Sequence, residues 1–285
     1  MPHVVLTGGS GKLGQVVWAD LLEHGYSVTS VDLVRPAAAP GPFVQADLTD
    51  MGQAMEVLHA IDDRHGGADA LVHLGAVPAP GMKPGAETFR NNTVSTFNVF
   101  SAARHFGVRN VVWASSETVL GLPFDTPPPY VPVDEEYTPR PESDYSLSKT
   151  IGEEMARQFC RRDPELKIIG LRFSNVMLVS EYAAFPSFDA DATLRKFNLW
   201  SYIDARDGAL AVRRALEADL TGAEVFIIAS PDTVMTRPAG ELLDEVFPGV
   251  PRKRETGPHE TLLSIDKARR MLGYDPQHSW RSEIG

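Results

Sequence analysis

The sequence predicts a doubly wound α/β fold, in which a parallel sheet carries helices on both faces. Strand-like runs alternate with helix-like runs along roughly the first 175 residues, which is the rhythm of such folds. Several runs, such as Val111-Val112-Trp113, are continuously apolar, as strands buried on both faces are. After about residue 174 the rhythm loosens, which predicts a small C-terminal lobe packed over the sheet.

Each element has its own pattern. Strands are expected at His3–Thr7, Ser27–Asp32, Phe43–Gln45, Ala70–Leu74, Asn110–Ala114 and Lys167–Phe173. Helices are expected near 12–24, 51–64, 86–106 and 145–161, and later near 207–218, 238–246 and 265–272. A further strand is expected at 224–228, and irregular covering structure over 180–200. The stretch 123–141 contains seven prolines and is expected to be a loop.

The first expected strand runs directly into a glycine-rich turn, Thr7-Gly8-Gly9-Ser10-Gly11-Lys12-Leu13-Gly14, and a helical pattern follows. Glycine permits a sharp turn and the close approach of a pyrophosphate, which the free amides at the helix start can hold. The repeated glycines are three residues apart, unlike the G-x-G-x-x-G of many dehydrogenases. Such turns also occur without a ligand, so the motif alone leaves both interpretations open.

Asp32 ends the second expected strand, 18 residues after Gly14. A carboxylate at about this spacing accepts hydrogen bonds from an adenosine ribose, at ~20 residues in the typical case. It would also repel a 2′-phosphate, so the sequence favours NAD over NADP, while Arg35 keeps NADP open. The alternative is an ordinary strand-end or turn residue.

Composition narrows the range of functions. The 285 residues, 43% hydrophobic and 23% charged, suit one large globular domain or a domain with a small lobe. The net charge of −11 argues against nucleic acid and anionic membranes as partners. The single cysteine, Cys160, excludes an intrachain disulfide, favours a cytoplasmic location and is expected to be a buried structural thiol. We expect no metal site, no signal peptide and no membrane span.

Tyr145 and Lys149 form a Tyr-x-x-x-Lys pair on one face of an expected helix. The lysine charge and a positive nicotinamide ring would lower the tyrosine pKa from its usual ~10. The phenol could then exchange a proton with a substrate hydroxyl while hydride moves. The alternative is an exposed helical pair. Ser115 and Ser116 end the preceding strand, where either hydroxyl could orient the reacting oxygen or simply cap a turn.

These motifs occur in the order seen in extended short-chain dehydrogenases/reductases. The chain resembles the NAD-dependent epimerase/dehydratase branch of that superfamily, strongly over about 3–176 and weakly beyond. Besides the glycine turn and Asp32, the matching segments are Asp47-Leu48, Leu74-Gly75-Ala76, Asn92, Ser115-Ser116 and Tyr145-x-x-x-Lys149. The resemblance implies a Rossmann-like domain over 1–175 and an interleaved substrate-binding lobe over 176–285.

The resemblance also implies roles for individual residues. Three would be catalytic: Ser116, Tyr145 and Lys149. Those that would bind NAD are Gly8, Gly11, Lys12, Leu13, Gly14, Asp32, Leu33, Asp47, Leu48, Leu74, Gly75, Ala76, Asn92, Tyr145, Lys149 and Val176. Those that would bind the substrate are Ser115, Glu117, Arg172 and Asn175. A homodimer would form through the helices near 86–106 and 145–161.

The chain departs from the family pattern after the sixth strand. The usual Asn-Val-Tyr-Gly-Pro is replaced by Asn175-Val176-Met177-Leu178-Val179, and the stretch from there to Tyr202 is short. In sugar-nucleotide epimerases this stretch carries much of the nucleotide-binding surface, so a large nucleotide-sugar is disfavoured. The short lobe resembles that of uronate dehydrogenases. Glu117 follows Ser116 without a second acid, which disfavours dehydration.

We therefore expect an NAD-dependent oxidoreductase that acts on a hydroxyl of a small sugar-like molecule, with a free sugar or uronate favoured. An epimerase that returns the hydride is the alternative, and an NAD-sensing protein without chemistry is a third, disfavoured because Tyr145 and Lys149 are both present. Specificity should lie in the loops 77–85, 117–143 and 177–201. A carboxylate or phosphate could meet Arg172, Arg195 or Lys196, although these could equally be surface charges, and we prefer that interpretation for Lys196.

Overall fold

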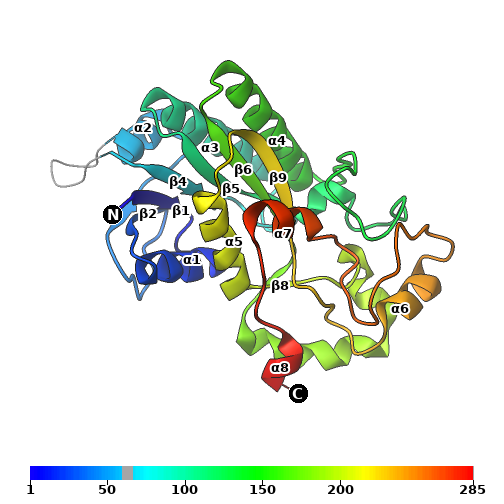
Figure 1. Ribbon diagram of the computed structural model, residues 1–285. Helices are drawn as coiled ribbons and strands as arrows, with labels where there is room; N and C mark the ends of the chain where they lie inside the picture. Colours follow the sequence, from blue (N-terminus) through cyan, green and yellow to red (C-terminus); the bar gives the residue numbers. More distant parts are fainter. Residues whose placement is uncertain (60–66, 285) are drawn as a thin grey trace.

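The computed structural model describes residues 1–59 and 67–284, and it contains a seven-stranded parallel sheet (Figure 1). Its strands are β1 (His3–Thr7), β2 (Ser27–Asp32), β3 (Phe43–Gln45), β4 (Ala70–His73), β5 (Asn110–Ser116), β6 (Lys167–Phe173) and β9 (Gly222–Ile228). They lie in the order β3-β2-β1-β4-β5-β6-β9, and every pairing is parallel. The predicted doubly wound α/β class is confirmed.

Helices cover both faces of this sheet (Figure 1). One face packs against α1 (Lys12–Glu23) and α5 (Ala205–Glu217), and the other against α2 (Met51–His59), α3 (Gly85–His105) and α4 (Asp144–Arg162). The chain reverses direction across the sheet between β1 and β4, so a crevice opens at the carboxyl ends of these two strands. The glycine turn after β1 and the Gly75 segment after β4 meet there.

The two faces have separate apolar cores. On the α3–α4 side, Phe100 meets the indole of Trp113 edge to face at 5.8 Å. A Cβ at Gly152 of α4 would lie 2.6 Å from that indole, so glycine lets α4 approach β5 closely. Cys160 is buried in the same core, and burial raises the pKa of its thiol to about 11, as a structural thiol requires.

A smaller lobe lies over the carboxyl end of the sheet. It contains the paired strands β7 (Val176–Met177) and β8 (Ile203–Asp204), the 3₁₀ segments η2 (Val179–Ala190) and η3 (Ala192–Asn198), and the helices α6 (Ala239–Val246), α7 (Asp266–Leu272) and α8 (Trp280–Ile284). The proline-rich loop packs on it through backbone bridges from Val131 to Arg252 and from Val133 to Leu263. Because α5 and β9 return to the main sheet, the lobe is interleaved with it (Figure 1).

The structure departs from the sequence expectations mainly outside the sheet. β4 ends at His73, one residue early, and β5 continues to Ser116 because its last residues pair with β6. The stretch 180–200, expected to be irregular, forms η2 and η3, and α8 had no clear sequence signal. Residues 60–64 of the helix expected over 51–64 lie outside the described residues. Within the described parts of the chain, no helix is long and apolar enough to cross a membrane.

Candidate active site

The glycine turn after β1 is folded tightly against the turn after β4. Gly8 has φ +74°, and a Cβ there would lie 2.5 Å from the amide nitrogen of Gly75. A Cβ at Gly14 would lie 2.0 Å from the carbonyl oxygen of Gly8. Helix α1 then begins after Gly11, and no side chain of the described residues caps it. The amides of its first turn, at Lys12 and Leu13, are therefore available to an anion.

Beside this turn is a cavity of about 290 Å³ whose lining fits the adenosine half of a dinucleotide. It is lined by residues of four strand ends, among them Gly8, Asp32, Leu33, Asp47, Leu48, Gly75 and Ala76. Asp32 is held in place because its oxygens accept hydrogen bonds from the amides of Ser10 at 3.0 Å and Leu33 at 2.7 Å. Hydrogen bonds from Thr49 lower the pKa of Asp47. The tight glycine turn, the uncapped helix and the fixed carboxylate fit NAD.

Asn92 does not face this cavity. Its amide oxygen accepts from the amide of Val77 at 2.8 Å, and its amide nitrogen donates to the Val77 carbonyl at 3.1 Å. Asn92 is 2% exposed and ties α3 to the loop after β4, which makes it a positioning residue in this structure, and its cofactor contact stays a prediction. The start of the same loop is tied to β1 through Thr7. The backbone amide of Leu74 donates to the Thr7 carbonyl, and the amide of Gly75 donates to the Thr7 hydroxyl. That hydroxyl also forms a hydrogen bond with Nδ1 of His73 at 2.7 Å.

Ser116, Tyr145 and Lys149 come together at the carboxyl end of β5. Ser116 lies at the strand end and Tyr145 in the first turn of α4, where Ser143 forms a capping box. The Ser116 and Tyr145 side chains interact, which lowers the tyrosine pKa. The Lys149 ammonium lies 5.7 Å from the centre of the Tyr145 ring and donates to the Ala114 carbonyl at 2.7 Å. All three side chains are buried.

The pKa of Tyr145 is raised, whereas the sequence predicted that it would be lowered. Burial raises it to about 12, partly offset by Ser116 and increased further by the charge of Glu117. The Lys149 charge is not among the effects that offset this burial; its ammonium donates to the Ala114 carbonyl, and burial lowers its own pKa to about 8. The expected lowering of the tyrosine pKa is therefore wrong for the protein without cofactor.

Ser115 and Arg172 belong to a buried network instead of lining the crevice. Arg172 makes a bidentate ion pair with Glu153 of α4, with both distances 2.8 Å, and the two side chains are 3% and 1% exposed. The Ser115 hydroxyl donates to the same carboxylate at 2.7 Å. The polar groups of Ser115 and Arg172, for which substrate contacts were expected, thus join α4 to β5 and β6 in this structure. Glu153 was not predicted as a site residue, because its partners Arg172 and Ser115 are 19 and 38 residues away.

Glu117 and Arg195 form a second buried polar cluster, next to Tyr145. The Glu117 carboxylate accepts from the Ser174 hydroxyl at 2.6 Å and from the Asn198 amide at 3.1 Å. Burial raises its pKa to about 7, against the lowering effect of these bonds and of Arg195. With its amide oriented to satisfy its neighbours, the Asn175 oxygen accepts from Arg195 at 3.1 and 3.2 Å. Lys196, by contrast, is a surface residue 3.5 Å from Asp125.

The expected cofactor residues Lys12 and Val176 meet above the glycine turn. The Lys12 ammonium donates to both oxygens of Glu181 in η2, at 2.8 and 2.9 Å, and to the Val176 carbonyl at 3.2 Å. This partly exposed contact links the start of α1 to the small lobe. Because Lys12 already has these partners, its amide rather than its ammonium is the group available to a pyrophosphate.

The parallel sheet, the dinucleotide cradle and the serine–tyrosine–lysine cluster define a protein of the extended short-chain dehydrogenase/reductase superfamily. The sequence model of the NAD dependent epimerase/dehydratase family matches residues 4–229. The chain belongs to this family, which is described as NAD dependent.

Known relatives fall into two groups. The chain is 31% identical to the uronate dehydrogenase of Pseudomonas syringae pv. tomato over 154 residues, which are 54% of this chain and 52% of that protein. It is 26% identical to the UDP-glucose 4-epimerase of Corynebacterium glutamicum, and the similarity covers 97% of this chain and 91% of that protein. The chain thus spans about half the length of the first curated relatives that it matches.

Solved structures share the fold over the whole chain. A short-chain dehydrogenase/reductase superfamily protein from Agrobacterium tumefaciens with bound NAD superposes with a TM-score of 0.73. The two chains are 23% identical, and the similarity covers 99% of this chain and 94% of the other. This likeness establishes the architecture, and the identity of the substrate has to be argued from the residues of this chain.

Proposed function

We propose that this protein is an NAD-dependent dehydrogenase that oxidises a hydroxyl of a free sugar acid. The observation that carries the proposal is the buried Arg195, whose charge acts on Glu117, the residue that follows Ser116 and whose own charge acts on Tyr145. The Ser116–Tyr145–Lys149 cluster supplies the acid–base chemistry of hydroxyl oxidation, and the guanidinium supplies a site for the substrate carboxylate. The similarity to a uronate dehydrogenase supports the same assignment.

In this mechanism Tyr145 is the general base that takes the proton of the substrate hydroxyl. NAD, when bound, supplies the hydride acceptor. The Ser116 hydroxyl accepts hydrogen bonds from the Thr118 amide at 3.2 Å and the Thr118 hydroxyl at 3.0 Å, which leaves its own proton for the Tyr145 oxygen or for a substrate oxygen that takes its place. Lys149 adds a positive charge on the same face of α4, 5.7 Å from the tyrosine ring. The high pKa of Tyr145 means that the phenol becomes a base only when further positive charge enters the site.

The proposed NAD site uses the turn at Gly8, Gly11 and Gly14, the first-turn amides of α1 and the carboxylate of Asp32. The other proposed contacts are those that line the adenosine cavity: Leu33, Asp47, Leu48, Gly75 and Ala76. Asp32 favours NAD over NADP because it would repel a 2′-phosphate. Arg35, the residue that kept NADP open, has its guanidinium 5.8 Å from the Phe43 ring, which supports the same preference.

Arg195 is the best candidate for the group that recognises the substrate carboxylate. It is 8% exposed and lies between the rings of Phe188 and Phe197, at 5.3 and 4.9 Å. No acidic side chain of the described residues forms a salt bridge with it, whereas Arg172 makes a bidentate ion pair with Glu153 and leaves only its Nη1 without a partner. A buried, positioned guanidinium without a contacting carboxylate suits an anionic ligand.

An epimerase is the second candidate, because the similarity to a UDP-glucose 4-epimerase covers nearly the whole chain. The two activities share the first hydride transfer and differ in the fate of NADH. A dehydrogenase releases NADH, whereas an epimerase returns the hydride and accumulates none.

The test is a near-ultraviolet absorbance assay for NADH with NAD and D-glucuronate, D-galacturonate, neutral sugars and UDP-sugars. We expect NADH with the free uronates, and expect Tyr145→Phe to lower kcat by ~10²–10⁴-fold while NADH affinity is retained. Tyr26→Phe, a remote and partly exposed tyrosine, is the control. No NADH with any substrate, together with tightly bound NAD and interconversion of UDP-sugars, would establish the epimerase instead.

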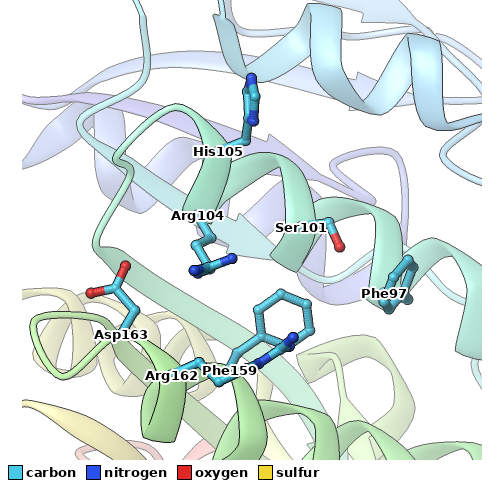
Figure 2. Close-up of a pocket in the computed structure, with 7 residues that line it drawn as sticks. All are labelled: Phe97, Ser101, Arg104, His105, Phe159, Arg162 and Asp163. Carbon is cyan, nitrogen blue, oxygen red and sulfur yellow. The ribbon is translucent and has the colours of Figure 1, made fainter.

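We also propose a cytoplasmic homodimer formed through α3 and α4. The outer face of these helices exposes Phe97 by 45% and Leu147 by 39%, which is unusual for large apolar side chains. Figure 2 shows Phe97 and Ser101 of α3 lining one pocket with Phe159 and Arg162 of α4. In sedimentation velocity we expect a dimer that Phe97→Glu dissociates and that Ile284→Glu, at another exposed apolar position, leaves intact. A monomeric wild type would contradict this proposal.

A further inference from the structure

Glu117 and Arg195 are buried opposite charges that do not touch. Glu117 is 4% exposed and Arg195 is 8% exposed. Both oxygens of Glu117 are held by neutral donors, the Ser174 hydroxyl and the Asn198 amide. Arg195 is held by the Ser201 carbonyl at 3.2 Å and by the Asn175 oxygen. The two charges therefore stabilise each other through space, as the opposite effects of each on the other's pKa show.

Two polar atoms of η3 in this cluster lack partners. Within the described residues, neither Nε of Arg195 nor Oδ1 of Asn198 has a hydrogen bond, although both are buried. Buried groups of this kind usually bind a ligand or a water molecule, because leaving them unpaired is costly. A carboxylate that entered here would accept a hydrogen bond from Arg195, and it would add a second negative charge near Glu117.

We propose that Glu117 takes up one proton from solvent when the carboxylate of a substrate docks on Arg195. The inference rests on the proposed function, since it assumes an anionic substrate at this guanidinium. Two carboxylates that share one buried guanidinium repel each other, and the repulsion favours the neutral form of the one that can be protonated. A sugar acid has a carboxyl pKa of ~3–4 and stays ionised near neutrality. Glu117, whose pKa burial already raises to about 7, is the acid that takes the proton.

The other groups around Glu117 do not titrate in its place. Tyr145 faces it from α4 and keeps its proton, because its pKa is raised to about 12. Arg195 faces it from η3 and remains charged near neutrality, and the hydrogen-bonding neighbours Ser174 and Asn198 are neutral. Glu117 is therefore the member of this cluster that changes charge near pH 7.

The sign of the resulting pH dependence is fixed. Below about pH 7, Glu117 is already protonated in the free protein, so the full charge of Arg195 is available to the substrate. Above about pH 7, Glu117 has to take up a proton from solvent each time a substrate binds. The affinity for a carboxylate therefore falls by up to about tenfold per pH unit. Affinity for a neutral sugar does not change for this reason. Glu117 is thus a positioning residue that makes recognition of acidic substrates dependent on pH.

The experiment is a calorimetric titration of D-glucuronate into the NADH-saturated protein, so that no turnover occurs. We expect the Kd to rise about tenfold between pH 6 and pH 8, with close to one proton taken up per ligand at about pH 8. The proton count comes from repeating the titration in buffers of different ionisation enthalpy. In Glu117→Gln the Kd should be independent of pH over this range, and Glu23→Gln, an exposed glutamate at the end of α1, should behave as wild type. Lys149 is retained in both variants, so the difference between proteins isolates Glu117.

Three results would overturn the inference. The first is a wild-type Kd that stays constant from pH 6 to 8 without proton uptake, and the second is a pH dependence that Glu117→Gln retains. In both cases the proposed function would stand. If D-glucuronate does not bind even at pH 6 while a neutral sugar is oxidised, the uronate assignment falls, and this inference falls with it. Should Glu117→Gln fail to fold, Glu117→Asp provides the variant: changing the titrating carboxylate should shift the pH at which the Kd begins to rise, and an unshifted profile would overturn the inference.

Discussion

The three repeated glycines of the turn after β1 are equivalent in the sequence, but the structure predicts unequal effects of replacing them. A Cβ at Gly14 would lie 2.0 Å from the Gly8 carbonyl oxygen and 2.8 Å from the Gly9 Cα, both backbone atoms. Ordinary contact begins at 3.4 Å, so Gly14→Ala requires the turn to move by about 1.4 Å. A Cβ at Gly11 would lie 3.3 Å from the same oxygen, and its φ of −72° suits any residue.

We therefore expect Gly14→Ala to lower the free energy of unfolding by ~1–3 kcal/mol, the usual cost of overpacking a rigid site. Gly11→Ala should change it by less than ~0.5 kcal/mol, because Gly11 is exposed and a shift of about 0.1 Å relieves its single close contact. Denaturant unfolding of the cofactor-free proteins measures both, and quenching or enhancement of NADH fluorescence measures the accompanying loss of affinity in Gly14→Ala. Equal destabilisation by the two substitutions would refute the reasoning, since only the Cβ at Gly14 would come closer than 3.0 Å to backbone atoms.

Three further predictions concern charged residues. Asp32→Ser should weaken NADH and strengthen NADPH binding in fluorescence titrations, because the repulsion of a 2′-phosphate is removed, and an unchanged ratio would contradict the role of Asp32. Glu153→Gln should lower the free energy of unfolding by ~3–5 kcal/mol in denaturant unfolding, because it leaves Arg172 buried without its counter-charge. The control is Glu154→Gln, which breaks the exposed Arg157–Glu154 pair and should cost under ~1 kcal/mol. Glu117 has a folded pKa of about 7 against 4.5 for an unperturbed glutamate, so its stabilising contribution is present below pH 4.5 and is lost as the pH rises to about 7. The stability gain of Glu117→Gln over wild type should grow across that window by about 3 kcal/mol, and a constant difference would contradict the burial of an ionised carboxylate.

The sequence predicted the sheet and the cofactor cradle because both depend on local patterns. Continuous apolar runs determine β1 to β6, and glycine spacing followed by Asp32 determines the turn and the carboxylate beside it. Tyr145 and Lys149 were predictable for the same reason, since a separation of four residues places them on one helical face. Their pKa values were not, because burial raises the pKa of Tyr145 and lowers that of Lys149, and burial is a property of the whole fold.

The candidate substrate residues depended on contacts between distant segments. Ser115 and Ser116 are neighbours on β5, yet their side chains point to opposite faces of the sheet, so Ser115 meets Glu153 and Ser116 interacts with Tyr145. Arg195 and Lys196 are also neighbours, and only the packing of η3 makes one buried and the other partly exposed. A single sequence has no signal for the pairing of Glu117 with Asn198, which is 81 residues away.

The buried Arg172–Glu153 ion pair affects the geometry of the site as well as the stability of the fold. Tyr145, Lys149 and Glu153 are each four residues apart, so they lie along one face of α4. Glu153 is bound by Arg172 of β6 and Ser115 of β5 at the end of this row, and Gly152 brings the helix against Trp113. A bidentate contact fixes direction as well as distance, so it sets the rotation of α4 about its axis. Buried ion pairs contribute little net stability compared with apolar residues, because desolvation offsets their attraction. What this one does is hold the face of α4 that carries Tyr145 against the carboxyl end of β5, where Ser116 lies.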